Sequence, residues 1–211
     1  MGAMRRTTCS GCGSRDLEPF LDLGMSPVAD AYTARAEDDS PQYPLEVAVC
    51  PKCRLVQLLE VVDADTLFGT GYSFYTSASA PLSAYHARYA DDVRSRYPVA
   101  AAQGIVEVGC NDGDLLRHFA ADFPTLGVDP ARGPATAARD RGLTVQIQPF
   151  GLQRALAIRD HRGRQGIIFA NHVLAHVADV ADVLSGIAAL LDEHRGVAMV
   201  EVQYLPDLLV N

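Results

Sequence analysis

Apolar and polar residues along the second half of this 211-residue chain follow an alternating strand and helix pattern. Short apolar runs rich in β-branched residues predict five strands, at 104–108, 126–129, 143–147, 166–170 and 197–202. Apolar residues at helical spacing predict helices between them, at 115–121, 134–141, 152–160 and 180–194. The last of these should close at Gly196 in the position after the helix end. The alternation predicts an α/β fold with a parallel sheet and helices on both faces.

The region before this pattern is organised differently. A helix is predicted over 80–97, ending at Pro98, with one apolar face formed by Leu82, Tyr85, Tyr89 and Val93. The first sixty residues predict a short strand and turn at 17–24 followed by irregular backbone. Residues 44–49 and 55–59 then predict a β-hairpin. We therefore divide the chain into a small β domain at 1–66, a connecting segment at 67–98 and a Rossmann-like domain at 99–211.

Four of the five cysteines form two pairs with metal-ligand spacing, Cys9-x-x-Cys12 and Cys50-x-x-Cys53. Two such pairs can supply four thiolates to one tetrahedral zinc ion, and four protein ligands leave no open position, so a structural role is predicted. Disulfides or free thiols are the alternative. The N-terminus has no secretory signal, so the chain is expected to be cytoplasmic, where structural disulfides are rare.

Composition limits the classes of partner. The net charge is −8 and the sequence pI is about 5.1, which argues against a large nucleic-acid surface. No apolar run reaches the ~20 residues that cross a bilayer. A small-molecule ligand is expected, with no nucleic acid and no membrane as partner, and the sequence leaves the oligomeric state open.

The segment 68–79 is dense in aromatic and hydroxyl side chains and contains two glycines. This composition makes a helix unfavourable, because glycine and hydroxyl residues weaken helices. We interpret the segment either as a wall of a substrate site or as a packed connector between domains.

The turn after the first strand of the α/β region carries the main chemical signal. Gly109 and Gly113 free the backbone for a tight turn at the carboxyl end of a strand, where open α/β sheets bind nucleotides. Asp129 ends the next strand, at the place where such folds accept ribose hydroxyls. The order Glu107-x-Gly109-x-Asn111-x-Gly113 departs from the dinucleotide fingerprint and is similar to the E/D-x-G-x-G-x-G turn of class I S-adenosylmethionine methyltransferases, with Asn111 replacing the middle glycine.

The whole chain resembles the zinc-containing C-methyltransferases that act on nucleotide-linked deoxysugars in natural-product pathways. The resemblance rests on both cysteine pairs and on the segments 21–27, 57–58, 72–79, 107–113, 173–177 and 200–205. It implies a class I methyltransferase sheet preceded by a small zinc-binding β domain, with S-adenosylmethionine and structural Zn²⁺ as cofactors. The implied substrate is a nucleoside-diphosphate keto-deoxysugar, and antibiotic biosynthesis is the implied setting.

The resemblance also implies a reaction and a set of residues. A sugar loses a proton beside its keto group, and the resulting enolate attacks the methyl donor. The residues implied to face the sugar as catalytic groups are Tyr72, Tyr75 and His176. The residues implied to face the cofactor are Glu107, Gly109, Asn111, Asp112, Gly113, Asp129, Gln148 and Asn171. Gln148 stands where the family usually has an acid, His172 where an asparagine is common, and Phe74 where a second tyrosine is found.

Other readings stay open. His176 considered alone could be a histidine at a helix start with no chemical role. The fold could serve another small-molecule acceptor, or the chain could be a truncated, non-catalytic module that binds zinc and cofactor. Because the family adds strands and a further domain, we expect a fragment of a longer protein rather than a natural short form.

Overall fold

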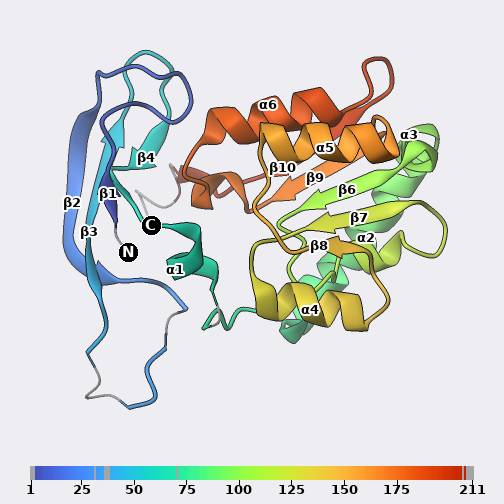
Figure 1. The fold of residues 1–211 in the computed structure, drawn as a ribbon, viewed down its shortest axis with the longest axis horizontal. Coiled ribbons are helices and arrows are strands. Elements are labelled where there is room, and N and C mark those ends of the chain that lie inside the picture. The colour runs from blue at the N-terminus through green and yellow to red at the C-terminus, as the bar shows by residue number, and fades with distance from the viewer. Residues whose placement is uncertain (1–2, 31, 36–38, 70, 206, 208–211) are drawn as a thin grey trace.

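The computed structural model describes residues 3–30, 32–35, 39–69, 71–205 and 207. Figure 1 shows an N-terminal β-rich region beside a layered α/β region, with the short helix α1 (Ala64–Phe68) between them. Thr70, in the predicted aromatic segment, lies outside the described residues.

The α/β region is built on one parallel sheet. Its strands are β6 (Ile105–Val108), β7 (Thr125–Val128), β8 (Val145–Gln146), β9 (Ile167–Asn171) and β10 (Val197–Glu201). They lie in the order β10-β9-β6-β7-β8, and every pairing is parallel. All four residues of the central strand β6 are buried, which explains its continuous apolar run. The predicted parallel α/β sheet is confirmed.

Helices cover both faces of this sheet (Figure 1). On one face α5 (Leu152–Arg162) and α6 (Val180–Leu190) pack against Val106 and Ile168. On the other face α2 (Ala80–Arg96), α3 (Pro98–Gln103) and α4 (Arg132–Asp140) pack against Ile105 and Ile167. Neighbouring residues of one strand point to opposite faces, so each strand contributes to both cores.

Three helix predictions need correction. The predicted helix at 115–121 is only a 3-10 turn, η2 (Leu116–His118), because Leu115, Leu116 and Phe119 are all buried and the short turn fixes them on the core. The helix predicted to reach 194 ends at Leu190, because Leu191 forms a parallel bridge with Gln165, and Gly196 is not its cap.

The face predicted for the helix at 80–97 is also partly wrong. Helix α2 buries His86, Ala90 and Val93, whereas Tyr85 is 36% exposed. Tyr89 packs edge-on against Phe169 and keeps its predicted place. The helix ends before Pro98 as predicted, but Pro98 then occupies the first turn of α3, a position that proline favours.

The N-terminal region contains two small antiparallel sheets. One has the order β2 (Glu18–Pro27), β3 (Gln42–Val49) and β4 (Val56–Leu58), and the other pairs β1 (Met4–Arg5) with β5 (Glu60–Val61). The predicted hairpin is therefore present as β3 and β4. The strand predicted to end near residue 24 continues to Pro27, because two register shifts let β2 keep pairing with β3 past its turn-forming residues.

Direct contacts join the two regions. The backbone N–H of Ala181 donates to the carbonyl of Ser10 at 2.9 Å, and the Arg6 guanidinium donates to the carbonyl of Ala178 at 2.9 Å. Within the described residues, no helix is long and apolar enough to cross a membrane.

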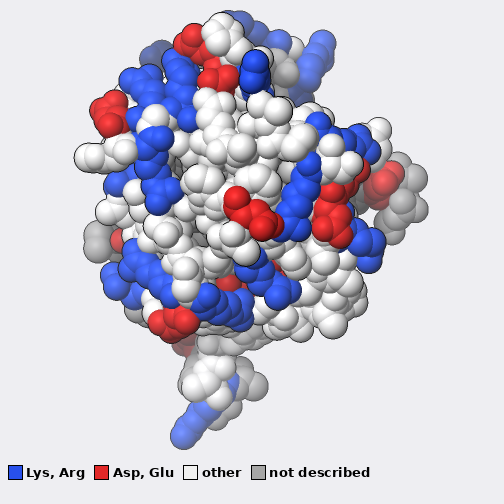
Figure 2. All heavy atoms as spheres, turned by 90° about the vertical axis from the view of Figure 1, so that its right-hand side faces the viewer, with Lys and Arg blue, Asp and Glu red and all other residues white. Residues whose placement is uncertain are grey.

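Figure 2 shows the face at the amino ends of the strands, where basic and acidic side chains are interspersed. Pairs at this end of the sheet include Arg94 with Asp122 at 3.0 Å and Arg164 with Glu193 at 2.6 Å. Arg94 and Arg164 are thus paired locally, away from the carboxyl ends of the strands.

Candidate functional site

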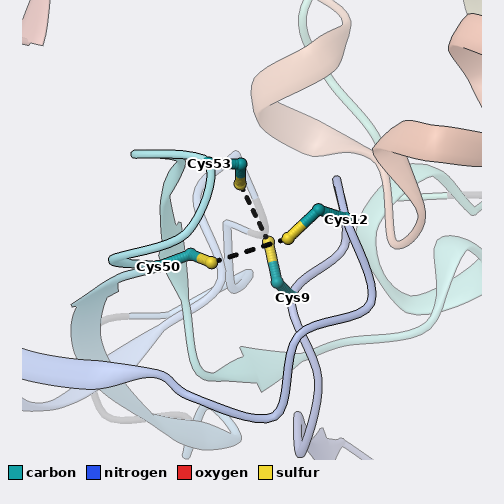
Figure 3. Close-up of side chains that lie close together, drawn as sticks. All are labelled: Cys9, Cys12, Cys50 and Cys53. Carbon is teal, nitrogen blue, oxygen red and sulfur yellow. Dashed lines mark hydrogen bonds between the residues drawn. The ribbon is translucent and has the colours of Figure 1, made fainter.

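The four paired cysteines converge on one point (Figure 3). Their Sγ atoms lie within 4.8 Å of one another, with 3.5 Å between Cys9 and Cys53 and 3.6 Å between Cys12 and Cys50. The Gln57 amide donates to the Cys9 sulfur at 3.3 Å. Burial raises the pKa of Cys9, but this hydrogen bond and those from the Gly11 and Cys12 backbones outweigh it and lower the pKa to about 6. Four cysteine sulfurs this close together fit one tetrahedral Zn²⁺.

A cavity of about 640 Å³ opens at the carboxyl ends of β6, β7 and β9. The α/β region supplies its floor, and α1 with the aromatic segment supplies the opposite wall. Predicted site residues from both walls line it: Tyr72, Glu107, Gly109, Asn111, Asp129, Asn171 and His176. The structure thus assembles residues from far-apart stretches of the chain around one volume of small-molecule size.

The glycine turn is shaped by its backbone. Gly109 has φ +69°, and a side chain there would overlap Val173. Asn111 has φ +50°, a conformation that asparagine tolerates better than most residues. The Asp129 carboxylate accepts from the Asn111 and Ala131 backbone N–H groups, each at 2.7 Å. Burial raises the pKa of Asp129, and these two hydrogen bonds oppose that effect.

Glu107 is a buried acidic residue in the cavity wall. It is only 7% exposed, and its Oε2 atom has no hydrogen-bond partner among the described residues. Burial and then the nearby Asp129 carboxylate raise its pKa well above the ordinary value. A buried carboxylate oxygen without a partner costs stability. The two carboxyl groups therefore fit a cationic amino group at Glu107 and hydroxyl groups near Asp129.

The side chains of Asn111 and Asp112 bind the aromatic segment. Asn111 accepts from the Thr76 N–H at 2.9 Å and donates to the Phe74 carbonyl at 3.1 Å. Asp112 is fully buried, accepts from the Ser77 hydroxyl and N–H, and pairs with Arg141 at 3.1 Å. These contacts tie the glycine turn to the opposite wall of the cavity.

Two predicted catalytic residues face the cavity with complementary properties. His176 lies in η3 (Leu174–His176), and burial followed by the charge of His172 lowers its pKa. Burial, followed by Asp30 and Asp129, raises the pKa of Tyr72 to about 12. At neutral pH His176 is therefore a neutral base, and Tyr72 keeps its hydroxyl proton.

Four other predicted site residues lie elsewhere. Among the described residues that line the cavity, Tyr75, Asp112, Gly113 and Gln148 are absent. Tyr75 packs against Gly133 on α4, Gly113 packs against Leu143, and Gln148 is exposed beside the cavity-lining Pro149.

The sequence analysis missed two polar clusters at the cavity. His86 contacts the fully buried Asp114 at 2.9 Å, and both residues line the cavity. His172, also in the lining, contacts Glu201 at 3.0 Å. The sequence did carry a signal for the first cluster. His86 lies at helical spacing from Tyr89 and Val93, on the same side of the helix, but it was left out of the predicted apolar face.

Comparison with known families assigns both regions. Residues 9–68 match a family described as "Putative zinc binding domain", and residues 83–209 match the family described as "Methyltransferase domain". The chain belongs to the methyltransferase domain family. This confirms the predicted class of protein and agrees with the predicted cofactors, S-adenosylmethionine and structural zinc.

Individual relatives match parts of this chain. The chain is 32% identical over 206 residues to the C-methyltransferase NovU of Streptomyces niveus, covering 96% of this chain and 49% of NovU. It thus spans about half the length of that relative. The structure of Streptomyces venezuelae DesVI aligns with 24% identity and a TM-score of 0.46, covering 59% of this chain and 52% of that chain. The S-adenosylmethionine-bound structure of CalS10, an amino pentose methyltransferase from Micromonospora echinaspora, aligns with 23% identity and a TM-score of 0.46, covering 64% and 59%.

Proposed function

We propose that this chain forms the zinc-containing, cofactor-binding part of an S-adenosylmethionine-dependent C-methyltransferase whose substrate is a nucleotide-linked keto-deoxysugar. The observation that carries the proposal is the 32% identity to a C-methyltransferase across 96% of the chain. The cavity supports it independently, because it combines a buried carboxylate for a cation with a neutral base and a hydroxyl donor.

The donor side of the cavity is formed by the glycine turn. Glu107 would hold the amino group of the cofactor, and Asp129 would accept from its ribose hydroxyls. S-adenosylmethionine, when bound, supplies the methyl group for transfer to carbon. Gly109 is needed at this turn because its φ is positive and Val173 occupies the place that a side chain would take.

The acceptor side would use His176 and Tyr72. His176 is neutral near pH 7 because burial lowers its pKa, so it can accept the proton from the carbon next to the sugar's keto group. Tyr72 retains its proton, so its hydroxyl can donate to the keto oxygen as negative charge develops there. Tyr75, against α4, and Gln148, outside the cavity lining of the described residues, would act only if the wall rearranges on binding.

Calorimetric titration with S-adenosylmethionine, followed by a methyl-transfer assay, tests the proposal. We expect binding by the zinc-loaded chain and a product heavier by one methyl group from a thymidine-diphosphate 4-keto-deoxysugar. Absence of binding at millimolar cofactor would contradict any methyltransferase role and leave a non-catalytic zinc module. Binding without transfer to the sugar, but with transfer to another small acceptor, would support a different substrate class.

A further inference from the structure

The N-terminal region is hydrogen-bonded to the segment that follows His176. Helix α6 begins on the side of the α/β region that faces the N-terminal sheets (Figure 1). The Arg6 guanidinium donates to the Ala178 carbonyl at 2.9 Å. The Ala181 N–H lies in the first turn of α6, where backbone N–H groups have no partner within a helix, and it donates to the Ser10 carbonyl at 2.9 Å. Two hydrogen bonds from the N-terminal region thus hold the start of α6 and the residue just before its cap.

A glutamine side chain joins Ser10 to the cysteine cluster. The Ser10 N–H donates to the Oε1 of Gln57 at 3.0 Å, and the Nε2 of Gln57 donates to the Sγ of Cys9 at 3.3 Å. Cys9 and Ser10 are both buried, so these contacts are shielded from water. Side chains that bond to a metal ligand fix its orientation, and Gln57 can do this for a zinc-bound Cys9. The cysteine cluster and α6 are therefore linked through Gln57 and the backbone of Ser10.

The direction of the His176 side chain depends on its backbone. The ring lines the cavity but has no hydrogen-bond partner among the described residues. Before it, the His172 N–H donates to the Glu201 carbonyl at 2.8 Å and holds the chain on β10. After it, Ala178 is held by Arg6, and only one residue separates His176 from Ala178. The stretch that carries His176 is therefore held at one end by the sheet and at the other by the N-terminal region.

We propose that the zinc site positions His176, with Gln57 and Arg6 as the positioning residues. A bound metal joins the two cysteine pairs, and Cys9 is followed directly by Ser10, so metal loss would loosen the part of the N-terminal region that holds α6. The chain on the carboxyl side of His176 would then lose both of its hydrogen bonds to that region. A base role for His176 rests on the proposed function, whereas the dependence of its position on the zinc site does not.

Hydrogen–deuterium exchange tests this dependence on the full chain, loaded with zinc or stripped of it by a chelator. The Ala181 amide should exchange about 5- to 10-fold faster without zinc, the factor expected for loss of one hydrogen bond of ordinary net strength. The amides of β6 are the internal control, because this strand lies in the centre of the α/β sheet, and their exchange should not change. Faster exchange confined to 177–181 would support the proposal, and equal exchange with and without zinc would overturn it.

A neutral substitution separates the link from the metal. Gln57→Met removes both amide hydrogen bonds but leaves the four cysteines and the net charge unchanged. Burial, followed by the charge of His172, lowers the pKa of His176, whereas Asp30 opposes this. In Gln57→Met with one zinc per chain, a pH titration followed by NMR of isotope-labelled histidine should show the pKa of His176 rising toward 6.5, because a loosened segment buries the ring less. The matched control is Gln42→Met, because Gln42 is exposed on β3 of the same sheet, and there the pKa of His176 should stay unchanged.

Each variant has a result that would overturn the proposal. If chelation unfolds the whole chain, zinc-loaded Gln57→Met decides alone, and an unchanged pKa of His176 with unchanged exchange at Ala181 would refute the link. If Gln57→Met loses zinc, Arg6→Met decides in its place, because Arg6 lies outside the cysteine pairs. Exchange at 177–181 should then accelerate, Arg6→Lys should restore part of the protection because it keeps a donor, and unchanged exchange in Arg6→Met would count against the proposal. These measurements need no methyl donor or acceptor, so they separate failure of this inference from failure of the proposed function, which the cofactor titration tests.

Discussion

Replacing Glu107 by Gln should make the ligand-free protein more stable and the cofactor complex weaker. Glu107 is 7% exposed, and its Oε2 has no partner within the described residues. Burial first, and Asp129 second, raise its pKa well above the ordinary value. The folded protein therefore binds this proton more tightly than the unfolded chain does.

The sign of the pH effect follows from that difference. Above the unfolded pKa of about 4.3 the unfolded chain has released the proton, whereas the folded chain still retains it or carries a buried, poorly solvated charge. The contribution of Glu107 to the free energy of unfolding is fully present below that pH. It is lost as the pH rises through the pKa of Glu107 in the folded protein. Gln removes the charge, so the two proteins should differ at pH 8 and converge near pH 4.

The magnitude follows from the environment of the carboxylate. An unsatisfied buried polar group costs about 1–3 kcal/mol, so Glu107→Gln should gain roughly that much unfolding free energy at pH 8. The lost charged hydrogen bond to an ammonium should weaken S-adenosylmethionine binding by about 10- to 100-fold. Opposite signs for folding and binding distinguish a ligand-binding carboxylate from a merely structural one.

Urea unfolding at pH 8 and pH 4, with calorimetric titration at pH 8, measures both quantities on zinc-loaded protein. Glu18→Gln is the control, because Glu18 is exposed on β2 and its removal should change stability by less than about 0.5 kcal/mol. Loss of stability in Glu107→Gln at pH 8, or unchanged cofactor affinity, would refute the reasoning.

Three further predictions test other parts of the molecule. Elemental analysis should find one zinc per chain. Cys50→Ser should bind well below one zinc per chain and unfold at lower temperature, because the metal joins the two cysteine pairs of the N-terminal region. Asn111→Gly accommodates the φ of +50° but loses both side-chain hydrogen bonds to the aromatic segment. Proteolysis at 71–79 should therefore accelerate, and the free energy of unfolding should fall by about 1–3 kcal/mol. Unchanged cleavage would contradict the role of these hydrogen bonds in holding the segment. If the proposed base is correct, kcat/KM should fall at acid pH with a pKa below 6.5, because burial and His172 lower the pKa of His176, and His176→Gln should remove that acid limb.

The sheet could be predicted from the sequence because its signal is local. Ile105, Val106, Ile167 and Ile168 are all fully buried, so the strands appear as uninterrupted apolar runs with glycine and polar residues between them. Helix boundaries were less predictable, because tertiary contacts decide them. Helix α6 ends before Leu191, which forms a bridge with Gln165, and no residue within the helix predicts that pairing.

The candidate site was predictable in position but not in side-chain direction. Strand ends and glycine spacing place Glu107 and Asp129 at one edge of a sheet, and both line the cavity. Spacing could not show that the Asp112 side chain turns away to bind Ser77 and Arg141. His86 and Asp114 lie 28 residues apart on different elements, so their contact depends on how α2 packs on the sheet.

Asn111 makes contacts on both sides of the cavity, through its backbone on one side and its side chain on the other. Its backbone N–H binds Asp129 at 2.7 Å, on the side of the proposed methyl donor, whereas its side chain holds Phe74 and Thr76 in the opposite wall. Glycine at this place in the turn would satisfy the backbone but could make neither side-chain contact. The segment that carries Tyr72 is therefore hydrogen-bonded to the turn itself, and any displacement of the turn on ligand binding must also move or release the wall that faces the acceptor. Asparagine achieves this coupling at the cost of a less favourable backbone conformation, which explains why a non-glycine residue can stand in the middle of a glycine turn.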